Sequence, residues 1–252
     1  MSKYWTRKGD QEDIDEKTVN PFAELLVKSD RTYPKRRTLK AALFDLDGTL
    51  VDTEDQYTIF WGGVARRYRP DVPELEQKIK GSTLERIYEM YFPDKELQKQ
   101  ITASLDEFEK QMRYEFIPGA LDFIKDLKSH DVRCAIVTSS NQPKIRAVLA
   151  SIHDLETLFD KILTSEDFSA SKPAPDCYLL GARVFNADID ECVVFEDAFN
   201  GLAAGTASGI FTIGVATNNS PDSIRDKCDY VINDFTEMSY EKLTDIMTGQ
   251  PT

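Results

Sequence analysis

Six short apolar runs, separated by helical segments, constrain the fold of this chain more than any other feature. The runs share a length of five to nine residues and flanking turn residues, and they are AALFD (41–45), VRCAIVTSS (132–140), KILTS (161–165), ECVVFED (191–197), IFTIGVAT (210–217) and DYVIN (229–233). Runs of this length and setting predict buried strands. Helical segments such as PKIRAVLASI, PDCYLLGARVF and FNGLAAGTASG lie between them. This alternation predicts an α/β protein with a parallel sheet and helices on both faces.

One interval interrupts the alternation, because residues 46–131 are too many for a single crossover. They read as successive helices: QYTIFWGGVARRY, PELEQKIK, LERIYEMYF and ELQKQITASLDEFEKQMRY. We therefore predict an all-helical cap at 55–114, inserted after the first strand into an α/β core of residues 38–54 and 115–252. Residues 1–37 show no sustained periodicity and predict an N-terminal extension, with one short helix near PFAELLVK.

The composition excludes several classes of protein. The 252 residues carry a net charge of −13, which argues against nucleic acid or an anionic membrane as the main partner. No run approaches the roughly 18 apolar residues of a membrane span, and the first residues are too polar for a secretion signal. We expect a cytoplasmic protein, monomeric by default, that acts on a small molecule.

Cysteine and histidine chemistry is disfavoured. The four cysteines form no C-x-x-C pair, which predicts reduced core residues. Cys177 and Arg183 have the C-x5-R spacing of cysteine-dependent phosphatases, but CYLLGAR reads as an amphipathic helix rather than an anion-cradling loop. The two histidines, at 130 and 153, lack metal-ligand spacing, so zinc catalysis is not expected.

Polar residues follow four of the predicted strands. They are carboxylates, hydroxyls and one ammonium: Asp45 and Asp47 after the first strand, Thr138 and Ser139 after the second, Lys172 in SKPAPD after the third, and Glu196 and Asp197 after the fourth. Taken singly, each reads as a turn or helix-cap residue. Because the carboxyl ends of parallel strands meet at one edge of a sheet, their joint occurrence predicts one site.

These residue types suit phosphoryl transfer. Carboxylates alone repel a phosphoryl group, and a Mg²⁺ ion bridging Asp45 and Asp197 removes that repulsion. Lys172 and Thr138 supply donors for the phosphoryl oxygens. One carboxylate can attack phosphorus, and the carboxylate two residues further on can protonate the leaving oxygen and later deprotonate water. As an acid, Asp47 would need a raised pKa, so we expect it to be less solvated than Asp45.

Over residues 39–248 the chain resembles the haloacid-dehalogenase-like phosphohydrolases, on DLDGT (45–49), Thr138, Lys172 and the pair at 196–197. The resemblance implies a doubly wound, Rossmann-like core with a helical cap, Mg²⁺ as cofactor, a phospho-aspartyl intermediate on Asp45, and Asp47 as acid and base. It also implies a metal site made of the Asp45 side chain, the Asp47 carbonyl, Asp197 and Glu196.

Within that family the chain is similar to the sugar-phosphate phosphatase and beta-phosphoglucomutase branch. Tyr57 and Leu84 stand where the mutases have a histidine and a cap arginine, so hydrolysis is favoured and a phosphosugar mutase is the alternative. The loop Gly81-Ser82-Thr83 is predicted to contact the substrate, together with Thr138, Ser139 and Lys172. The substrate is expected to be a small phosphorylated metabolite, a sugar or polyol phosphate.

Two other classes share part of the pattern. A signalling receiver domain also uses a phosphorylated Asp, an acidic cluster, Thr and Lys, but it lacks a helical insertion and a second aspartate such as Asp47. A glycosyltransferase uses D-x-D to hold a metal-bound nucleotide. That function does not explain Thr138, Lys172 and the pair at 196–197. Turnover of small phosphate esters would separate these classes from a phosphatase.

Overall fold

The computed structural model describes residues 38–152 and 155–249 and contains one parallel sheet. Its strands are β1 (Ala41–Phe44), β2 (Arg133–Val137), β3 (Lys161–Leu163), β4 (Cys192–Glu196), β5 (Phe211–Val215) and β6 (Tyr230–Ile232). Their order is β3-β2-β1-β4-β5-β6, and every pair is parallel. All six predicted strands and the doubly wound sheet are confirmed. The short helix predicted near PFAELLVK lies outside the described residues.

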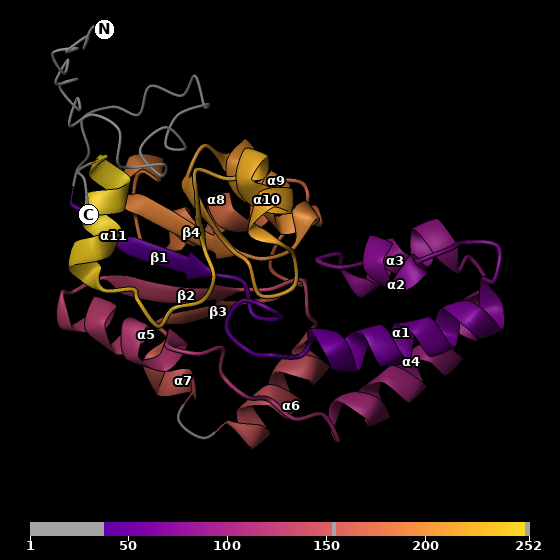
Figure 1. Cartoon of the computed structure of the whole chain (residues 1–252). Coiled ribbons are helices and arrows are strands. Elements are labelled where there is room, and N and C mark those ends of the chain that lie inside the picture. The colour runs from indigo at the N-terminus through magenta and orange to yellow at the C-terminus, as the bar shows by residue number, and fades with distance from the viewer. Residues whose placement is uncertain (1–37, 153–154, 250–252) are drawn as a thin grey trace, which may run out of the picture.

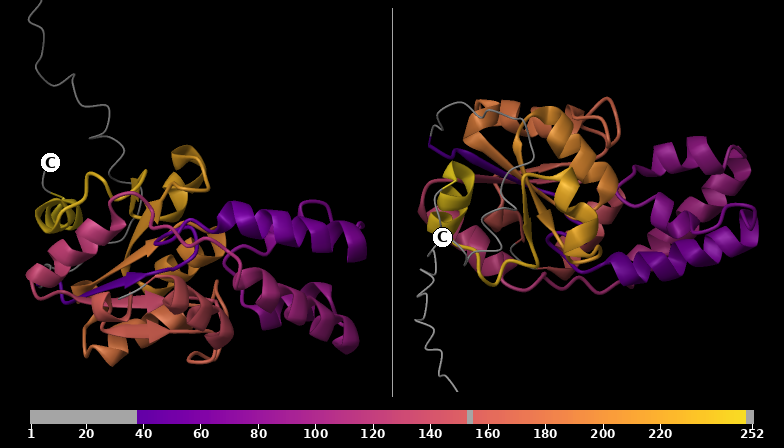
Figure 2. Two further views of the ribbon diagram at one scale, coloured as in Figure 1. Left: turned by 90° about the horizontal axis from the view of Figure 1, so that it is seen from below. Right: turned by 45° about the horizontal axis from the view of Figure 1, so that its top comes forward.

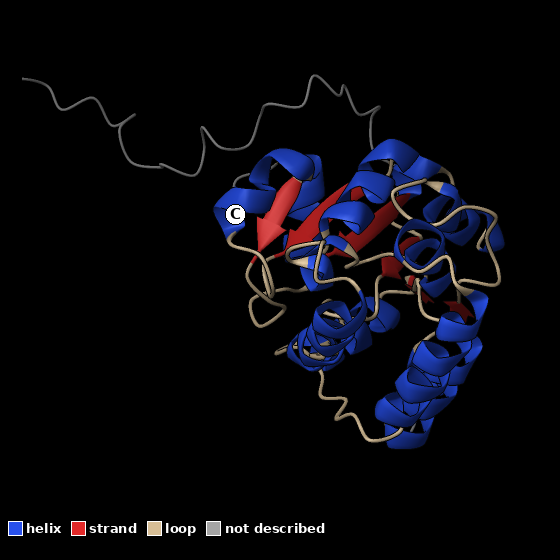
Figure 3. Cartoon of the chain, turned by 90° about the vertical axis from the view of Figure 1, so that its right-hand side faces the viewer, coloured by secondary structure: helices blue, strands red, loops and turns tan. Residues whose placement is uncertain are grey.

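Helices cover both faces of the sheet, as Figures 1 and 3 show. One face carries α5 (Ala120–Ser129), α6 (Gln142–Ser151), α7 (Leu155–Leu158) and α11 (Tyr240–Thr248), and the other carries α8 (Asp176–Val184) and α9 (Phe199–Ser208). A four-residue helix, α10 (Pro221–Ile224), and two short 3-10 turns, Ile189–Glu191 and Arg225–Lys227, complete the loops between β3 and β6. Sequence reasoning identified the helices at α6, α8 and α9 but not α5 or α11.

The central strand β1 is buried on both faces because its alternating side chains enter two different apolar clusters. Ala42 and Phe44 pack with α5, α6 and α11, whereas Ala41 and Leu43 pack with α8 and α9. The ring of Phe44 stacks on Phe195 of β4, with ring centroids 4.7 Å apart. Each fully buried side chain of this size contributes about 2 kcal/mol. This packing holds the carboxyl ends of β1 and β4 side by side.

A separate helical lobe, residues 54–109, extends from the carboxyl edge of the sheet (Figures 1 and 2). It consists of α1 (Glu54–Tyr68), α2 (Leu75–Lys78), α3 (Leu84–Tyr91) and α4 (Lys95–Glu109). Side chains from all four helices form an apolar cluster of their own. Asp94 caps α4 by accepting from the backbone N–H groups of Glu96 and Leu97. The helix predicted up to residue 114 ends at Glu109.

Two extended segments join the lobe to the core, and they run side by side. Val51 and Phe116 form an antiparallel bridge. The N–H of Asp52 donates to the carbonyl of Glu115 at 2.9 Å, and the N–H of Ile117 donates to the carbonyl of Leu50 at 2.9 Å. The lobe is therefore attached at one paired connection directly beside the end of β1. Within 38–152 and 155–249, no helix is both long and apolar enough to cross a bilayer.

Candidate active site

The turn after β1 brings the first motif against the end of β4. The N–H of Asp45 donates to the carbonyl of Phe195 at 3.0 Å, and the N–H of Gly48 closes the turn onto Val51 at 2.8 Å. Gly48 has φ +79°, and a Cβ there would lie 2.4 Å from Oδ2 of Asp197. Only glycine allows both this backbone conformation and the close approach of the two loops.

Lys172 is fully buried and connects the strand ends. Its Nζ donates to Oδ1 of Asp45 at 2.6 Å, to Oε1 of Glu196 at 2.6 Å and to the carbonyl of Val137 at 3.2 Å. Burial alone would lower the pKa of this ammonium, but the charges of Asp45 and Glu196 raise it above its usual value. Lys172 therefore stays charged and links the ends of β1, β2 and β4.

Glu196 and Asp197, at the end of β4, are held by several donors. Oε2 of Glu196 accepts from the backbone N–H groups of Asp197 and Ala198, and Oε1 accepts from the Tyr178 hydroxyl. Asp197 accepts from the Thr49 hydroxyl at 2.9 Å and from the side-chain amide of Asn218 at 3.0 Å. These bonds orient both carboxylates, as the supporting contacts of a metal site do.

Asp45, Glu196 and Asp197 form a buried cluster whose ligand atoms all lie within 4.8 Å of one another. Burial raises the pKa of Asp45 to about 8, opposed by Lys172, and burial and the charge of Glu196 raise the pKa of Asp197 well above its usual value. These three carboxylates surround a single ammonium, that of Lys172, so the buried cluster carries excess negative charge. A hard divalent cation relieves this repulsion, and an all-oxygen donor set fits Mg²⁺.

The environment of Asp47 differs from the expectation of a raised pKa. The buried ammonium of Lys144 forms an ion pair with Oδ1 of Asp47, and the hydroxyls of Thr53 and Ser140 donate to the same carboxylate at 2.6 and 2.9 Å. Burial raises the pKa of Asp47, but Lys144 and these hydrogen bonds outweigh it and hold the pKa below its usual value. The Asp47 side chain is 17% exposed, against 10% for Asp45, so it is not the less solvated of the two.

Sequence reasoning missed Lys144, which is 1% exposed. Its ammonium also lies 4.2 Å from the ring centre of Tyr57, whose hydroxyl donates to Oε1 of Glu109 at 2.8 Å. Burial raises the pKa of Glu109, opposed by the charge of Lys144. The available signal was the position of Lys144 in the first turn of α6, where the helix dipole disfavours a cation. A lysine there needs a nearby anion.

The loop after β2 supplies hydroxyls on the opposite side of the site. Thr138 is buried, and its Oγ1 accepts from the N–H of Ser140 at 3.0 Å. The Ser139 hydroxyl donates to the carbonyl of Gly81 in the lobe at 2.9 Å. Asn200, at the start of α9, also donates to the carbonyl of Lys80 at 2.9 Å. These bonds hold the lobe against the sheet edge in a closed arrangement.

The predicted cap loop is divided between two roles. Gly81 and Ser82 line the cavity between lobe and core, whereas Thr83 does not. The Thr83 side chain caps α3 by accepting from the N–H of Arg86, and its own N–H donates to the Ser171 hydroxyl at 3.1 Å. In this arrangement Thr83 contacts the core rather than the cavity.

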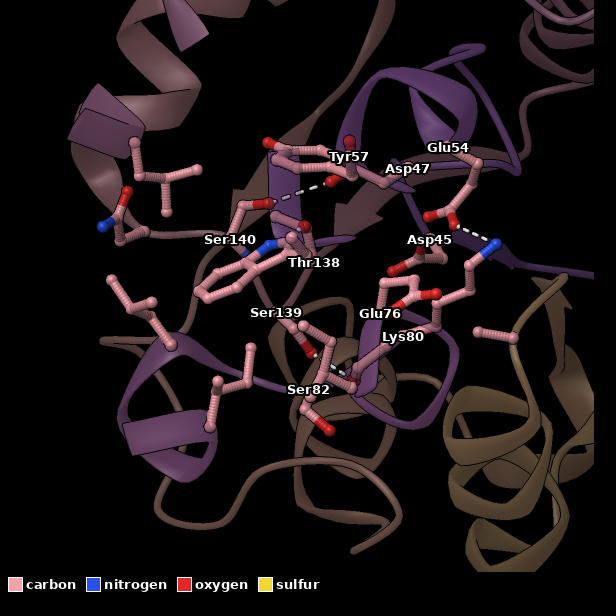
Figure 4. A pocket seen from close by; sticks show the side chains of 18 of the residues that line it. Asp45, Asp47, Glu54, Tyr57, Glu76, Lys80, Ser82, Thr138, Ser139 and Ser140 are labelled. Carbon is pink, nitrogen blue, oxygen red and sulfur yellow. Dashed lines mark hydrogen bonds and ion pairs between the residues drawn. The ribbon is translucent and has the colours of Figure 1, made fainter. Parts of the chain in front are cut away.

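Figure 4 shows this cavity, which has a volume of about 110 Å³ and opens between the lobe and the ends of β1 and β2. The predicted residues that line it are Asp45, Asp47, Gly81, Ser82, Thr138 and Ser139. Lys172, Glu196 and Asp197 do not line it, but Lys172 donates to Asp45, which does. Cys177 lies in α8 with its thiol pKa raised to about 11 by burial, which disfavours cysteine catalysis there.

Fold and site together define an α/β enzyme with a carboxylate–lysine centre at the switch point of its sheet. Residues 42–215 match the haloacid dehalogenase-like hydrolase family. The chain belongs to that family.

Known relatives and solved structures agree with this assignment. The chain is 33% identical over 202 residues to a Saccharomyces cerevisiae protein named "Probable pseudouridine-5'-phosphatase", covering 70% of this chain and 82% of that protein. It is 32% identical to hexitol phosphatase A of Escherichia coli, covering 81% and 94% of the two chains. The crystal structure of a HAD hydrolase from Entamoeba histolytica superposes with a TM-score of 0.72 at 26% identity, covering 83% of this chain and 99% of the other.

Proposed function

We propose that this protein is a Mg²⁺-dependent phosphatase that removes phosphate from a small phosphorylated metabolite, a sugar or polyol phosphate, through a phospho-aspartyl intermediate on Asp45. The observation that carries the proposal is the geometry of Asp45. Lys172 donates to its Oδ1, while no described residue donates to Oδ2. One oxygen is thus anchored and the other is free to attack phosphorus.

The metal would be held by the side chains of Asp45 and Asp197, with Glu196 and the Asp47 carbonyl completing the protein ligands. Of these carboxylates, Glu196 accepts the largest number of protein hydrogen bonds, and it also anchors Lys172. When bound, Mg²⁺ neutralises negative charge and polarises the phosphoryl oxygens. The Thr138 hydroxyl lines the cavity and can donate to those oxygens, whereas Lys172 directs its three N–H groups to Asp45, Glu196 and the Val137 carbonyl.

The residues act in two half-reactions. The free oxygen of Asp45 forms a bond to phosphorus while the ester bond breaks, and the leaving oxygen takes a proton from Asp47. Entry of a phosphate dianion beside Asp47 raises its pKa, which favours uptake of that proton. In the second half-reaction, Asp47 takes a proton from water as the water oxygen attacks phosphorus and releases Asp45. The anionic state that Lys144 maintains suits this second step.

The names of relatives and the size of the cavity support a small substrate. Hexitol phosphatase and pseudouridine-5'-phosphatase act, by their names, on small phosphorylated molecules. A partly open cavity of about 110 Å³ suits a phosphate with a small leaving group and not a folded macromolecule.

Two positions favour hydrolysis over the mutase alternative. A mutase must retain and turn over a bisphosphate, which needs a cation for the second phosphate. Leu84 offers no charge to the cavity that it lines. The Tyr57 hydroxyl donates to Glu109, and its ring lies against the Lys144 ammonium. Tyr57 is therefore not available to bind a second phosphate.

The test is a screen of sugar, polyol and nucleoside monophosphates for release of inorganic phosphate. We expect release with Mg²⁺, none after chelation of the metal, and no need for a bisphosphate activator. Asp45→Asn protein serves as the control for a contaminating phosphatase. Conversion of a sugar 1-phosphate into its 6-phosphate without free phosphate would identify a mutase, and absence of both reactions would refute the proposal.

A further inference from the structure

The lobe side of the cavity carries an excess of negative charge. Three carboxylates line it, those of Glu54, Glu76 and Glu109, against one ammonium, that of Lys80. This ammonium is paired with Glu54 at 2.8 Å, as the dashed line in Figure 4 shows. Within the described residues, no unpaired cation therefore lines the space where the leaving group of a phosphate ester would lie.

The other cations near the cavity are also occupied. Lys144 is paired with Asp47, and Lys172 with Asp45 and Glu196. Arg66 lies near Glu76 on the neighbouring helix α1, but it does not line the cavity. Glu76 is half-buried, and no ion pair or hydrogen bond joins its carboxylate to any residue in 38–152 or 155–249. A second anionic group on a substrate would meet this carboxylate without a partner.

Apart from Gly81 and Ser82, the remaining lining of the lobe side is apolar. Six side chains contribute to it, four of them from α1 and α3 and two of them aromatic: Tyr57, Trp61, Ile79, Leu84, Ile87 and Leu105. Such a surface can pack against the carbon skeleton of a leaving group but cannot solvate a charge.

From this lining we propose that the cavity selects phosphate monoesters whose leaving group is uncharged or cationic, and that Glu76 is a specificity-determining residue that rejects a second anionic group. The inference rests on the proposed phosphatase function and narrows its substrate class. Bisphosphates and phosphorylated sugar acids are disfavoured substrates, whereas neutral sugar, polyol and nucleoside monophosphates, and amino sugar phosphates, are accepted.

A matched set of substrates tests this proposal. Glucitol 6-phosphate, 6-phosphogluconate and 1-amino-1-deoxyglucitol 6-phosphate share an open six-carbon chain and differ mainly in the charge at C1, so the leaving group is neutral, anionic and cationic, respectively. With like charges about 8 Å apart near a protein surface, kcat/KM for the anionic ester should be roughly tenfold to thirtyfold lower than for the neutral one. Phenyl phosphate with carboxyl or aminomethyl substituents provides the same comparison should the sugars be poor substrates.

The variant Glu76→Gln keeps the size of the side chain and removes its charge. We expect the ratio of kcat/KM for the anionic ester to that for the cationic ester to rise at least about fivefold. Glu85→Gln is the matched control, because Glu85 is exposed on the same lobe and does not line this cavity. Its ratio should stay at the wild-type value.

The possible outcomes distinguish failure of the proposed phosphatase function from failure of the proposed charge selection. If wild-type protein releases phosphate from none of the sugar or phenyl esters, the proposed phosphatase function is wrong and this inference falls with it. Phosphate release with equal kcat/KM for anionic and cationic esters leaves the phosphatase intact and refutes the charge selection. If the ratio of kcat/KM for the anionic and cationic esters is the same in Glu76→Gln as in the wild type, Glu76 is not the residue that selects against the anionic ester.

Discussion

Replacing Lys144 by methionine tests whether the buried Lys144–Asp47 pair is an important electrostatic contact of this fold. Methionine keeps most of the length and the apolar character of the lysine stem, and it removes the ammonium that lies over the Tyr57 ring. Asp47 is then left 17% exposed, without its ion-pair partner. Removal of one member of a buried pair costs about 3–5 kcal/mol of the free energy of unfolding.

The structure places the expected value at the low end of that range. The hydroxyls of Thr53 and Ser140 still donate to Asp47 at 2.6 and 2.9 Å, so the isolated carboxylate remains partly solvated by protein. We therefore expect a loss of about 3 kcal/mol at pH 7. This is a large part of the roughly 5–15 kcal/mol by which proteins of this kind are stable.

The pH dependence follows from the pKa of Asp47. In the wild type that pKa is lowered, so the stabilising contribution is present above the unfolded-state value of about 3.9 and is lost as the pH falls through the folded-state value. In Lys144→Met, burial is opposed only by the Thr53 and Ser140 hydrogen bonds, so we expect the pKa of Asp47 to rise above its unfolded-state value and the native variant to take up a proton before the unfolded chain does. When the pH is lowered from 7 to 4.5, the difference in stability between wild type and variant should narrow by about 1.4 kcal/mol for each unit by which the Asp47 pKa of the folded variant lies above 4.5.

Urea unfolding followed by circular dichroism at both pH values measures these differences. Lys125→Met is the control, because Lys125 is exposed on α5, and it should change stability by less than about 0.5 kcal/mol. In a double-mutant cycle, Asp47→Asn combined with Lys144→Met should be less destabilised than the sum of the single changes by about 2 kcal/mol. A loss at pH 7 no greater than that of the control, or a strictly additive cycle, would show that the pair contributes nothing.

Three further changes probe the site. Asp45→Asn removes the attacking charge and a metal ligand, so the rate of phosphate release should fall more than about a hundredfold with the circular dichroism spectrum unchanged; a larger residual rate argues against covalent catalysis at this residue. Asp47→Asn should slow turnover of nitrophenyl phosphate and accumulate phosphoenzyme, seen as a mass increase of about 80 Da, whereas full steady-state turnover excludes it as the base. Gly201→Ala places a Cβ 1.7 Å from Oε1 of Glu196, so we expect a loss of about 1–3 kcal/mol in urea unfolding together with reduced activity, and an unperturbed protein would contradict the close packing.

The pattern of the sequence determined the architecture of the core, because apolar period and turn chemistry are local properties. Six runs bounded by turn residues became six parallel strands, and the polar residues after β1, β2 and β4 met at one edge. The same locality explains the errors at boundaries. The helix predicted up to residue 114 ends at Glu109, although charged and apolar residues continue in the sequence; Met112 and Tyr114 after it are buried in the apolar cluster of the core.

Only the tertiary structure decided the electrostatics of the site. Lys144 follows Asp47 by 97 positions, so no local pattern relates the two, yet this ion pair reverses the expected direction of the Asp47 pKa. Thr83 likewise follows Ser82 directly, but a helix begins after it and turns its side chain from the cavity to the cap of α3. Residue types that suit a chemistry can be recognised in a sequence. Their charge states depend on burial and on partners from distant segments, which exist only once the chain has folded.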